Sequence, residues 1–268
     1  REQDSIGIED LAANDIEAIS FIYNIPLWLI NLWISEFGRD KTEDLCAWFN
    51  EQPKLTARIN TILIDIPQCL TMLNEQGWAV TQDSNYEDII YINSHRGSLE
   101  KSEAFIKGYI TFMDKASMLV ARLVNPQPGE RILDCCAAPG GKSMYMATLM
   151  DNVGSLMSCD IHEHKIELMN SNADRLGASI VHTKVQDATK LPDSWNSYFD
   201  RVLVDAPCSG LGILQKKLDM RWRKQESILR ELPPLQLAIL ERAAMTVKEK
   251  GYLIYSTCTL NYKENEEV

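Results

Sequence analysis

The chain has 268 residues, of which 45% are hydrophobic and 24% charged, and its formal net charge is −11. This composition is typical of a globular protein with one large or two small domains, and no apolar run approaches the roughly 18–20 residues of a membrane-spanning helix. The acidic balance argues against a nucleic-acid partner for the chain as a whole.

The N-terminal part predicts a helical segment followed by a small α+β module. Apolar residues recur at three-to-four spacing over 26–50 until Pro53 stops the pattern. The next predicted elements are, in order, a strand at 58–64, a helix at 67–76 and a strand at 88–93. We therefore assign 1–49 to a helical or linker segment and 50–110 to the α+β module.

The C-terminal part predicts alternating strands and helices. A helix over 111–124 ends at the breaker Asn125-Pro126-Gln127-Pro128-Gly129. The elements predicted beyond it are strand 131–134, helix 142–150, strand 155–159, helix 163–176, strand 180–184, strand 201–204, helix 235–246 and strand 251–256. This α/β alternation predicts a doubly wound, Rossmann-like parallel sheet with right-handed crossovers for a domain over 111–268.

A turn of small residues joins the first strand of this domain to its first helix. It reads Asp134-Cys135-Cys136-Ala137-Ala138-Pro139-Gly140-Gly141-Lys142, and its glycines let a ligand approach the backbone closely. Ligands of such sheets bind at the carboxyl ends of the strands. Asp160 ends the second strand, where it can accept from ribose hydroxyls, and Asp187 follows the third strand, near an adenine edge. The turn matches neither the dinucleotide-binding pattern GxGxxG nor the P-loop pattern GxxxxGK[ST]. Three interpretations stay open: a site for S-adenosylmethionine, a site for a nicotinamide cofactor, and a capped turn that binds no ligand.

Two cysteines follow core strands of the same sheet. One stands in Asp205-Ala206-Pro207-Cys208-Ser209-Gly210 and the other in Tyr255-Ser256-Thr257-Cys258-Thr259. A single cysteine at such a place is usually a buried core residue, but two thiols beside a predicted cofactor turn favour chemistry. The seven cysteines contain no CxxC pair, so no metal site is predicted, and the adjacent Cys135 and Cys136 fit a cytoplasmic location.

Thiols at this place suit methyl transfer to carbon 5 of cytosine. Addition of a thiolate to carbon 6 makes carbon 5 enamine-like, so that it attacks the methyl group of a sulfonium. Loss of the carbon 5 proton and expulsion of the thiolate complete the cycle, which is covalent catalysis. Asp205 is placed to assist at cytosine N3 and N4, and the attacking thiol needs a setting that stabilises its thiolate.

These segments resemble the bacterial ribosomal RNA cytosine-5 methyltransferases of the Sun/Fmu type, within the NOL1/NOP2/Sun family. The likeness covers about 22–268 and includes Pro26-Leu27-Trp28-Leu29 and Leu55-Thr56-Ala57-Arg58-Ile59-Asn60-Thr61. It implies that the 50–110 module is similar to an RNA-recognition motif. It also implies that a monomer acts on a cytosine in 16S ribosomal RNA, free or in the assembling small-subunit particle, with no membrane partner.

The resemblance implies a role for each matching residue. Cys258, in the Thr-Cys motif, corresponds to the nucleophile, and Cys208, in the Pro-Cys motif, to the thiol that assists product release. DNA enzymes attack with a Pro-Cys cysteine and lack the Thr-Cys partner, so the presence of both favours RNA. The residues expected to contact S-adenosylmethionine are Cys136, Ala137, Ala138, Pro139, Gly140, Gly141, Lys142, Asp160, Asp187 and Asp205.

One basic segment offsets the acidic balance of the chain. Its cations, opposed only by Asp219, are Lys216, Lys217, Arg221, Arg223 and Lys224. Such a patch can grip a phosphate backbone, and Trp222 within it can stack on a base. A solvated loop with a packed aromatic side chain explains the same residues equally well.

The sequence departs from the family's pattern at Met113, where the family usually has glutamine. The resemblance also implies a helical domain of NusB kind before residue 1, and a further helix and closing strand pair after Val268, so we expect a C-terminally incomplete catalytic domain. A catalytically inactive ribosome-assembly factor that binds S-adenosylmethionine and RNA is therefore the alternative to an enzyme. A nicotinamide dehydrogenase is disfavoured by the Cys-Ala-Ala-Pro-Gly-Gly-Lys turn.

Overall fold

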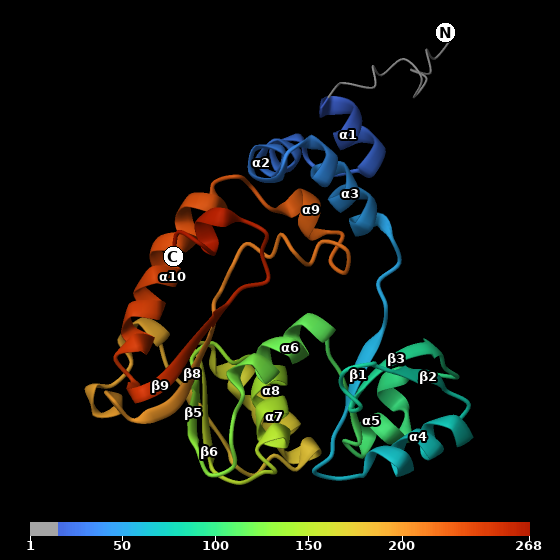
Figure 1. Ribbon diagram of the computed structural model, residues 1–268, viewed down its shortest axis with the longest axis vertical. Coiled ribbons are helices and arrows are strands. Elements are labelled where there is room, and N and C mark those ends of the chain that lie inside the picture. Colours follow the sequence, from blue (N-terminus) through green and yellow to red (C-terminus); the bar gives the residue numbers. More distant parts are fainter. Residues whose placement is uncertain (1–15) are drawn as a thin grey trace. The chain divides into compact units, whose positions relative to one another are not determined.

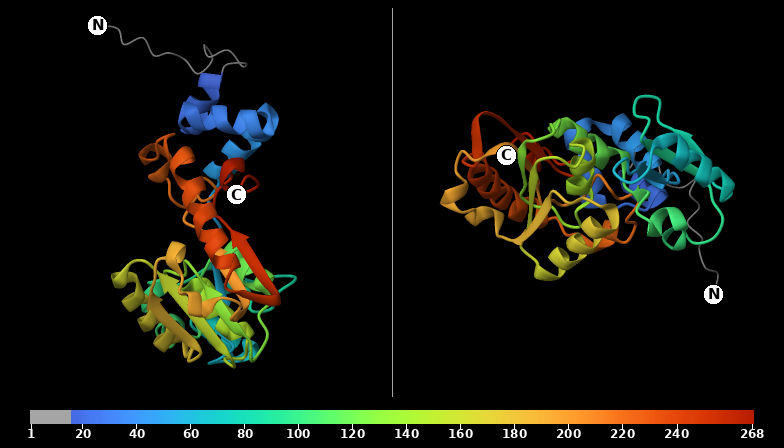
Figure 2. Two further views of the ribbon diagram at one scale, coloured as in Figure 1. Left: turned by 90° about the vertical axis from the view of Figure 1, so that its left-hand side faces the viewer. Right: turned by 90° about the horizontal axis from the view of Figure 1, so that it is seen from below.

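The computed structural model describes residues 16–268, which pack as two units. The first unit joins three stretches of chain, namely the described residues through Pro53, Cys208–Pro234 and Cys258–Val268. These are blue, orange and red in Figure 1 and Figure 2. The second unit joins Lys54–Pro207 to Leu235–Thr257. The first unit thus contains two segments that the sequence-based boundaries place in the catalytic domain.

The first unit is mainly helical. Its helices are α1 (Ile16–Tyr23), α2 (Leu27–Phe37), α3 (Arg39–Asn50) and the short α9 (Met220–Arg223). Gly38 divides the single run predicted over 26–50, because its φ of +82° is a conformation that favours glycine. Leu211 and Leu214 pack with Trp33 in one apolar core, so the loop after Cys208 folds with the N-terminal helices.

Within residues 16–268, no single helix is long and apolar enough to cross a membrane. By length and composition, α1 and α2 meet that test only together, as a pair bent by 116°.

The second unit begins with a ferredoxin-like module. Its elements are β1 (Thr56–Ile59), α4 (Ile66–Glu75), β2 (Ala79–Gln82), β3 (Ile89–Ser94), α5 (Glu103–Ile106) and β4 (Ile110–Phe112). The strands pair antiparallel in the order β2-β3-β1-β4, which confirms the predicted α+β module. The sequence missed β2, which is largely exposed, and β4, whose three residues merge with the helix predicted over 111–124.

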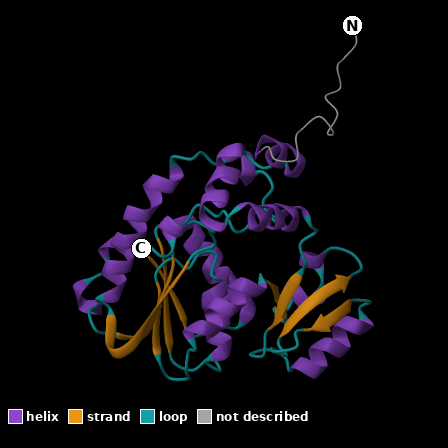
Figure 3. Ribbon diagram, turned by 45° about the horizontal axis from the view of Figure 1, so that its top comes forward, coloured by secondary structure: helices purple, strands orange, loops and turns teal. Residues whose placement is uncertain are grey.

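The rest of the second unit is the predicted parallel sheet with its helices (Figure 3). Its elements are α6 (Lys115–Val124), β5 (Arg131–Asp134), α7 (Gly141–Leu149), β6 (Ser155–Asp160), α8 (Glu163–Leu176), β7 (Val181–Val185), β8 (Phe199–Asp205), α10 (Ile228–Ala244) and β9 (Val247–Ser256). All strands pair in parallel in the order β7-β6-β5-β8-β9, so the doubly wound α/β prediction is confirmed. The unit boundary falls inside α10 at Pro234, which follows Pro233, and prolines inside a helix remove backbone hydrogen bonds.

Successive residues of each core strand enter different apolar cores, because side chains alternate across a sheet. Ile132 and Leu203 pack with residues of α6 and α7. Leu133 and Val202 pack on the other face, with Ile239 of α10. The sheet is therefore covered on both faces, as its predominantly apolar strands predict.

One face of the ferredoxin-like sheet is buried against this domain. Fully buried Arg58 donates from Nη1 to Thr148 Oγ1 of α7 at 3.2 Å, and Tyr145 of α7 donates to Asp88 Oδ2 at 2.6 Å. The same carboxylate pairs with Arg122 of α6. Burial lowers the pKa of Arg58 to about 10, so the guanidinium stays protonated at neutral pH. The module thus supports α7, the helix that follows the glycine turn.

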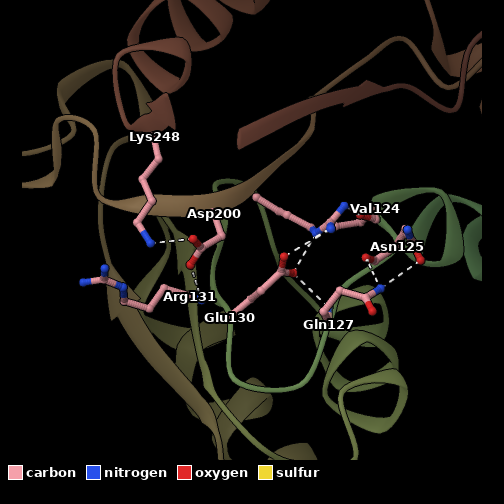
Figure 4. Close-up of polar contacts among 8 residues, drawn as sticks. Val124, Asn125, Gln127, Glu130, Arg131, Asp200 and Lys248 are labelled. Atoms are coloured by element: carbon pink, nitrogen blue, oxygen red, sulfur yellow. Dashed lines mark hydrogen bonds and ion pairs between the residues drawn. The ribbon is translucent and has the colours of Figure 1, made fainter. Parts of the chain in front are cut away.

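Ion pairs fix the amino-terminal edge of the parallel sheet (Figure 4). Glu130 accepts from Arg201 Nε and Nη2 at 2.6 and 3.1 Å, and Arg201 Nη1 donates to Val124 O at 2.9 Å. Asp200 accepts from the backbone N–H of Arg131 at 2.8 Å. These bonds tie the proline-containing breaker to β5 and β8 at the edge opposite the glycine turn.

Two glycines with the same backbone conformation test the docking of the ferredoxin-like module. Gly108 has φ of +72° and Gly97 has φ of +74°, but an added Cβ overlaps the Arg175 carbonyl oxygen only at Gly108, while Gly97 faces open space. We expect Gly97→Ala to lower the free energy of unfolding by about 1–2 kcal/mol and Gly108→Ala by about 2–4 kcal/mol. Urea denaturation measures both, and equal effects would contradict the tight docking.

Candidate active site

The glycine turn lies where the strand order of the parallel sheet reverses. Its backbone is held by neighbouring strands, since Ala137 N donates to Cys159 O at 2.7 Å and Cys135 N donates to Leu203 O at 2.9 Å. Gly140, with φ of +97°, immediately precedes α7. The Cys136–Lys142 turn therefore stands at the carboxyl ends of the strands, where such sheets bind ligands.

Met113 lies beside this turn. A Cβ added to Gly141 would stand 3.8 Å from the Met113 sulfur, which is ordinary contact distance. The position where the resemblance implies a glutamine thus faces the glycine turn. In place of a polar amide, it offers the turn a flexible apolar side chain.

Asp134, the last residue of β5, is a buried carboxyl that sequence reasoning did not assign to the site. Ser143 Oγ donates to its Oδ2 at 2.7 Å. Burial raises the pKa of Asp134 to about 7, since the charged form is poorly solvated there. A carboxylate at the end of an apolar strand carries no sequence signal of its ionisation state, which depends on solvent exclusion by the fold.

Lys142 and Asp205 form an ion pair across the switch point of the sheet. Lys142 Nζ lies 2.6 Å from Asp205 Oδ2, and Ser256 Oγ donates to Asp205 Oδ1 at 2.8 Å. Both carboxylate oxygens of Asp205 are therefore held by donors from α7 and β9. Lys142 was expected at the cofactor, and in this structure its ammonium group orients the carboxylate.

The two remaining aspartates differ in their surroundings. Asp160 is buried at the end of β6, and its Oδ1 accepts from His162 N at 3.0 Å and lies 3.5 Å from Lys165 Nζ. Asp187 caps the short 3₁₀ helix Ala188–Lys190 by accepting from Thr189 N and Oγ1 at 2.9 and 2.7 Å. These bonds lower the pKa of Asp187, so it stays ionised as a local cap.

In the first unit, the two predicted thiols face each other. Cys208 Sγ lies 3.0 Å from Cys258 Sγ, which is a hydrogen-bond contact and longer than a disulfide of about 2.05 Å. The Cys258 backbone N–H also donates to Cys208 Sγ at 3.2 Å. The hydrogen bond with Cys258 and then burial raise the pKa of Cys208 well above its ordinary value. Cys208 therefore favours its protonated form, and Cys258 is the exposed member of the pair.

Glu264, in the 3₁₀ helix Tyr262–Glu264, ties the two thiol turns together, and sequence reasoning missed it. This fully buried carboxylate accepts from Ser209 N at 2.8 Å and from Asn261 Nδ2 at 2.9 Å. Ser209 Oγ contacts both Glu264 and Thr259 Oγ1, the latter at 2.7 Å. The residues after Cys208 and after Cys258 thus share one buried network. Sequence alone favours an exposed glutamate, since charged residues are rarely buried.

Gly212 brings the same two turns into close contact. Its backbone N–H donates to Cys258 O at 2.9 Å, and a Cβ at Gly212 would stand 2.9 Å from that oxygen. Only glycine fits this approach without displacing the Cys258 backbone.

The structure brings together some of the predicted residues within each unit. Lys142 meets Asp205 in the second unit, and Cys208 meets Cys258 in the first. Along the chain, Cys208 follows Asp205 by three residues, and Cys258 follows the end of β9 at Ser256 by two. Asp187 instead caps the 3₁₀ helix Ala188–Lys190.

The predicted basic segment is only partly a surface patch. Arg221 is buried, and its Nη2 donates to Phe49 O at 2.6 Å while its Nη1 donates to Asn50 Oδ1 at 2.8 Å. The prediction that Arg221 is available to phosphates is therefore wrong, because the helix end of α3 leaves carbonyl groups that this guanidinium satisfies.

Family models match both parts of the chain. The model "16S rRNA methyltransferase RsmB/F" matches residues 121–268, and a ferredoxin-like domain model of RsmF/B-like methyltransferases matches residues 25–97.

Individual proteins are similar over most of the chain. The probable ribosomal RNA small subunit methyltransferase B of Bacillus subtilis (strain 168) is 40% identical over 244 residues, covering 91% of this chain and 54% of that protein. The crystal structure of PH0851 has a TM-score of 0.89 at 33% identity, covering 95% of this chain and 57% of that one. A methyltransferase homolog from Pyrococcus horikoshii has a TM-score of 0.83 at 25% identity, with 94% and 79% covered. The chain spans about half the length of the curated relatives it matches.

The buried carboxyl of Asp134 predicts a pH-dependent stability. Its pKa rises from 3.8 to about 7 on folding, so between these values the folded state holds a proton that the unfolded state has lost. The free energy of unfolding should therefore fall as pH rises from about 4 to 7 and level off above 7. In Asp134→Asn this decline should be reduced, with the variant more stable than the parent at pH 8, as thermal denaturation across pH can measure. An unchanged pH profile in the variant would contradict the raised pKa.

Loss of the Glu264 carboxylate should loosen the thiol turns. In Glu264→Gln the side-chain NH₂ group faces the N–H donors of Ser209 and Asn261 and cannot accept from them. We therefore expect the free energy of unfolding to fall by about 1–3 kcal/mol. The rate of alkylation at Cys258 should also change its pH dependence, because the turn that carries Cys208 is released. The matched control is Glu266→Gln, at an exposed glutamate two residues away, which should leave both measurements unchanged.

Proposed function

Because the chain belongs to the family of 16S rRNA methyltransferases RsmB/F, we propose that its full-length protein methylates carbon 5 of a cytosine in small-subunit ribosomal RNA. S-adenosylmethionine is the proposed methyl donor. The family match over 121–268 supports RNA methyl transfer, and the residues of the candidate site support the choice of carbon 5.

The observation that carries this proposal is the Cys208–Cys258 contact at 3.0 Å. Carbon 5 becomes nucleophilic only when a thiolate adds to carbon 6, so the reaction needs a thiol that ionises and is accessible. Cys258 is exposed, whereas the raised pKa of Cys208 favours a protonated, hydrogen-bond-donating thiol. Cys258 is therefore the proposed nucleophile, and Cys208 stabilises its thiolate by donating a hydrogen bond.

The proposed reaction begins with addition of the thiolate to the base. The Cys258 thiolate forms a bond to carbon 6, the electron pair of the C5–C6 double bond moves through carbon 4 toward N3, and N3 takes a proton from water. Carbon 5 then attacks the sulfonium methyl group, which leaves S-adenosylhomocysteine. Water takes the carbon 5 proton, the C–S bond breaks to return the Cys258 thiolate, and the N3 proton returns to water. Cys208 supports that last step, because a thiol proton close to the departing sulfur stabilises the leaving thiolate.

Asp205 is the proposed partner of the cytosine ring. Its carboxylate is oriented by Lys142 at 2.6 Å and Ser256 at 2.8 Å. A fixed carboxylate at this strand end can accept hydrogen bonds from the N4 amino group and from an N3 that has taken a proton from water. That proton neutralises the electron density that enters the ring, and the carboxylate stabilises the protonated N3. Groups held in place before reaction cost little reorganisation when charge develops.

The glycine turn and Asp160 are the proposed binding residues for the methyl donor. The turn from Cys136 to Gly141 has a backbone that a ligand can approach closely. Burial raises the pKa of the Cys136 thiol, so that its side chain is neutral. The buried Asp160 carboxylate can accept hydrogen bonds from two ribose hydroxyls. Asp187 is the proposed contact to the adenosine, and the hydrogen bonds of its helix cap keep it ionised. The residues present fit a nucleoside with a positively charged sulfur, since carboxylates surround the site.

Replacement of the two thiols tests the proposal in the full-length protein. Cys258→Ala should lower methyl transfer to 16S ribosomal RNA by at least about 1000-fold, because the covalent route is lost. Cys208→Ala should accumulate an RNA–protein adduct that survives denaturant, because the leaving thiolate loses its hydrogen-bond donor. The control Cys69→Ala, at a buried cysteine of the ferredoxin-like module, should remain active.

Full activity of Cys258→Ala would contradict the nucleophile assignment. Calorimetric binding of S-adenosylmethionine by a parent protein that transfers no methyl group to ribosomal RNA would instead support the binding-only alternative. Bisulfite sequencing of ribosomal RNA from a deletion strain reports whether the product is 5-methylcytosine.

A further inference from the structure

A cavity in the first unit is lined by aromatic and polar side chains. Its volume is about 330 Å³, and its lining residues are Glu17, Ser20, Phe21, Asn24, Leu27 and Trp222. They come from α1, the start of α2 and α9, so the cavity lies wholly within the helical unit. Phe21 is 66% exposed and Trp222 is 60% exposed, although both side chains are large and apolar. Two exposed aromatic side chains at one cavity indicate a binding surface.

The backbone that carries Trp222 is anchored by its neighbour. Arg221 is buried, donates to Phe49 O and Asn50 Oδ1, and contacts Tyr23 O at 3.4 Å. Tyr23 belongs to α1, which supplies Glu17, Ser20 and Phe21 to the cavity, and the other two partners belong to α3, so α9 is tied to both helices. Trp222 is thus presented by a fixed helix, and ordering it on binding costs little conformational entropy.

Charge around Trp222 suits a polyanion. Within 216–224 the exposed or half-exposed cations are Lys216, Lys217, Arg223 and Lys224, and the exposed carboxylate is Asp219. Arg230, Glu226 and Glu231 are exposed further along the chain, and Glu17 lines the cavity itself. Arg223 directly follows Trp222 and remains 79% exposed while it contacts Asp219 at 3.2 Å. Phosphates of a nucleic acid can compete for such a weak surface pair.

From this arrangement we propose that the cavity takes one unstacked base of a single-stranded RNA segment. The base stacks on Trp222 and Phe21, and its polar edge meets the Asn24 amide and the Ser20 hydroxyl oxygen, which accepts because its own proton is donated to Ile25 O at 2.6 Å. The adjacent cations hold the phosphates on either side. This inference rests on the proposed function, since it adds a second base-binding position on the RNA that carries the target cytosine.

Nucleic acid fits the cavity better than an apolar peptide for two reasons. Half of its lining residues, Glu17, Ser20 and Asn24, are polar, which suits a base with hydrogen-bonding groups at its rim. Arg223 and Lys224 directly follow Trp222 in the chain, and a stacking platform beside positive charge is the usual pattern of single-strand binding.

The test measures RNA affinity apart from methyl transfer. A fluorescein-labelled oligoadenylate of about 12 nucleotides contains no cytosine, and its binding to the full-length protein is followed by anisotropy. Trp222→Ala should raise the Kd roughly 5- to 100-fold, and Phe21→Ala should raise it too, whereas Trp222→Phe should keep most of the affinity because it keeps a stacking ring.

Trp48→Ala is the matched control. Trp48 is 46% exposed in the same unit but does not line the cavity. Its affinity should equal that of the parent, with folding of every variant checked by circular dichroism. Equal affinity of Trp222→Ala and the parent, or an equal loss in Trp48→Ala, would overturn the inference. A fully active Cys258→Ala would reject the proposed mechanism without altering the oligoadenylate result, so the two failures are distinguishable.

Discussion

The parallel pairing of β5 with β8 is the constraint on which the candidate site depends. Strand order reverses at β5, and sheets of this kind bind ligands at the carboxyl ends of the strands where the order reverses. The glycine turn leaves β5, Asp205 ends β8, and the Lys142–Asp205 ion pair joins them at this point. Each thiol then follows a strand of the same half of the sheet within three residues along the chain. The residues proposed for catalysis thus stand at the ends of adjacent strands or shortly after them along the chain.

Three buried carboxylates show how neighbours decide what a buried charge does. Asp88 meets Arg122 and a tyrosine hydroxyl and thereby fastens the ferredoxin-like module to α6 and α7. Glu264 is surrounded by neutral donors and holds two turns together. Asp134 receives a serine hydroxyl, and burial raises its pKa to about 7. A buried charge needs hydrogen-bond donors or a counter-charge. The three side chains are chemically alike, so their different roles come from the different groups that surround them.

The sheet face of the ferredoxin-like module that could contact RNA is buried. In an RNA-recognition motif the open sheet face stacks bases, but here that face carries Arg58 and Ile89 and is packed against the methyltransferase domain. The module therefore acts as a support for α7. The exposed aromatic side chains of the proposed base-binding cavity, Phe21 and Trp222, lie on the helical unit. The acidic net charge of the chain does not conflict with a local basic surface there.

The sequence by itself determined the order of strands and helices in the parallel domain, the glycine turn and the strand ends that carry Asp205, Cys208 and Cys258. These follow from local periodicity and from motif spacing, which require no knowledge of distant contacts. Tertiary structure alone decided that Arg221 is an internal anchor, that Glu264 is buried, and that Cys208 lies 3.0 Å from Cys258. Those outcomes depend on residues far apart in the chain, since burial and pairing of a polar group are set by whatever packs against it, and its own sequence neighbours carry no record of that.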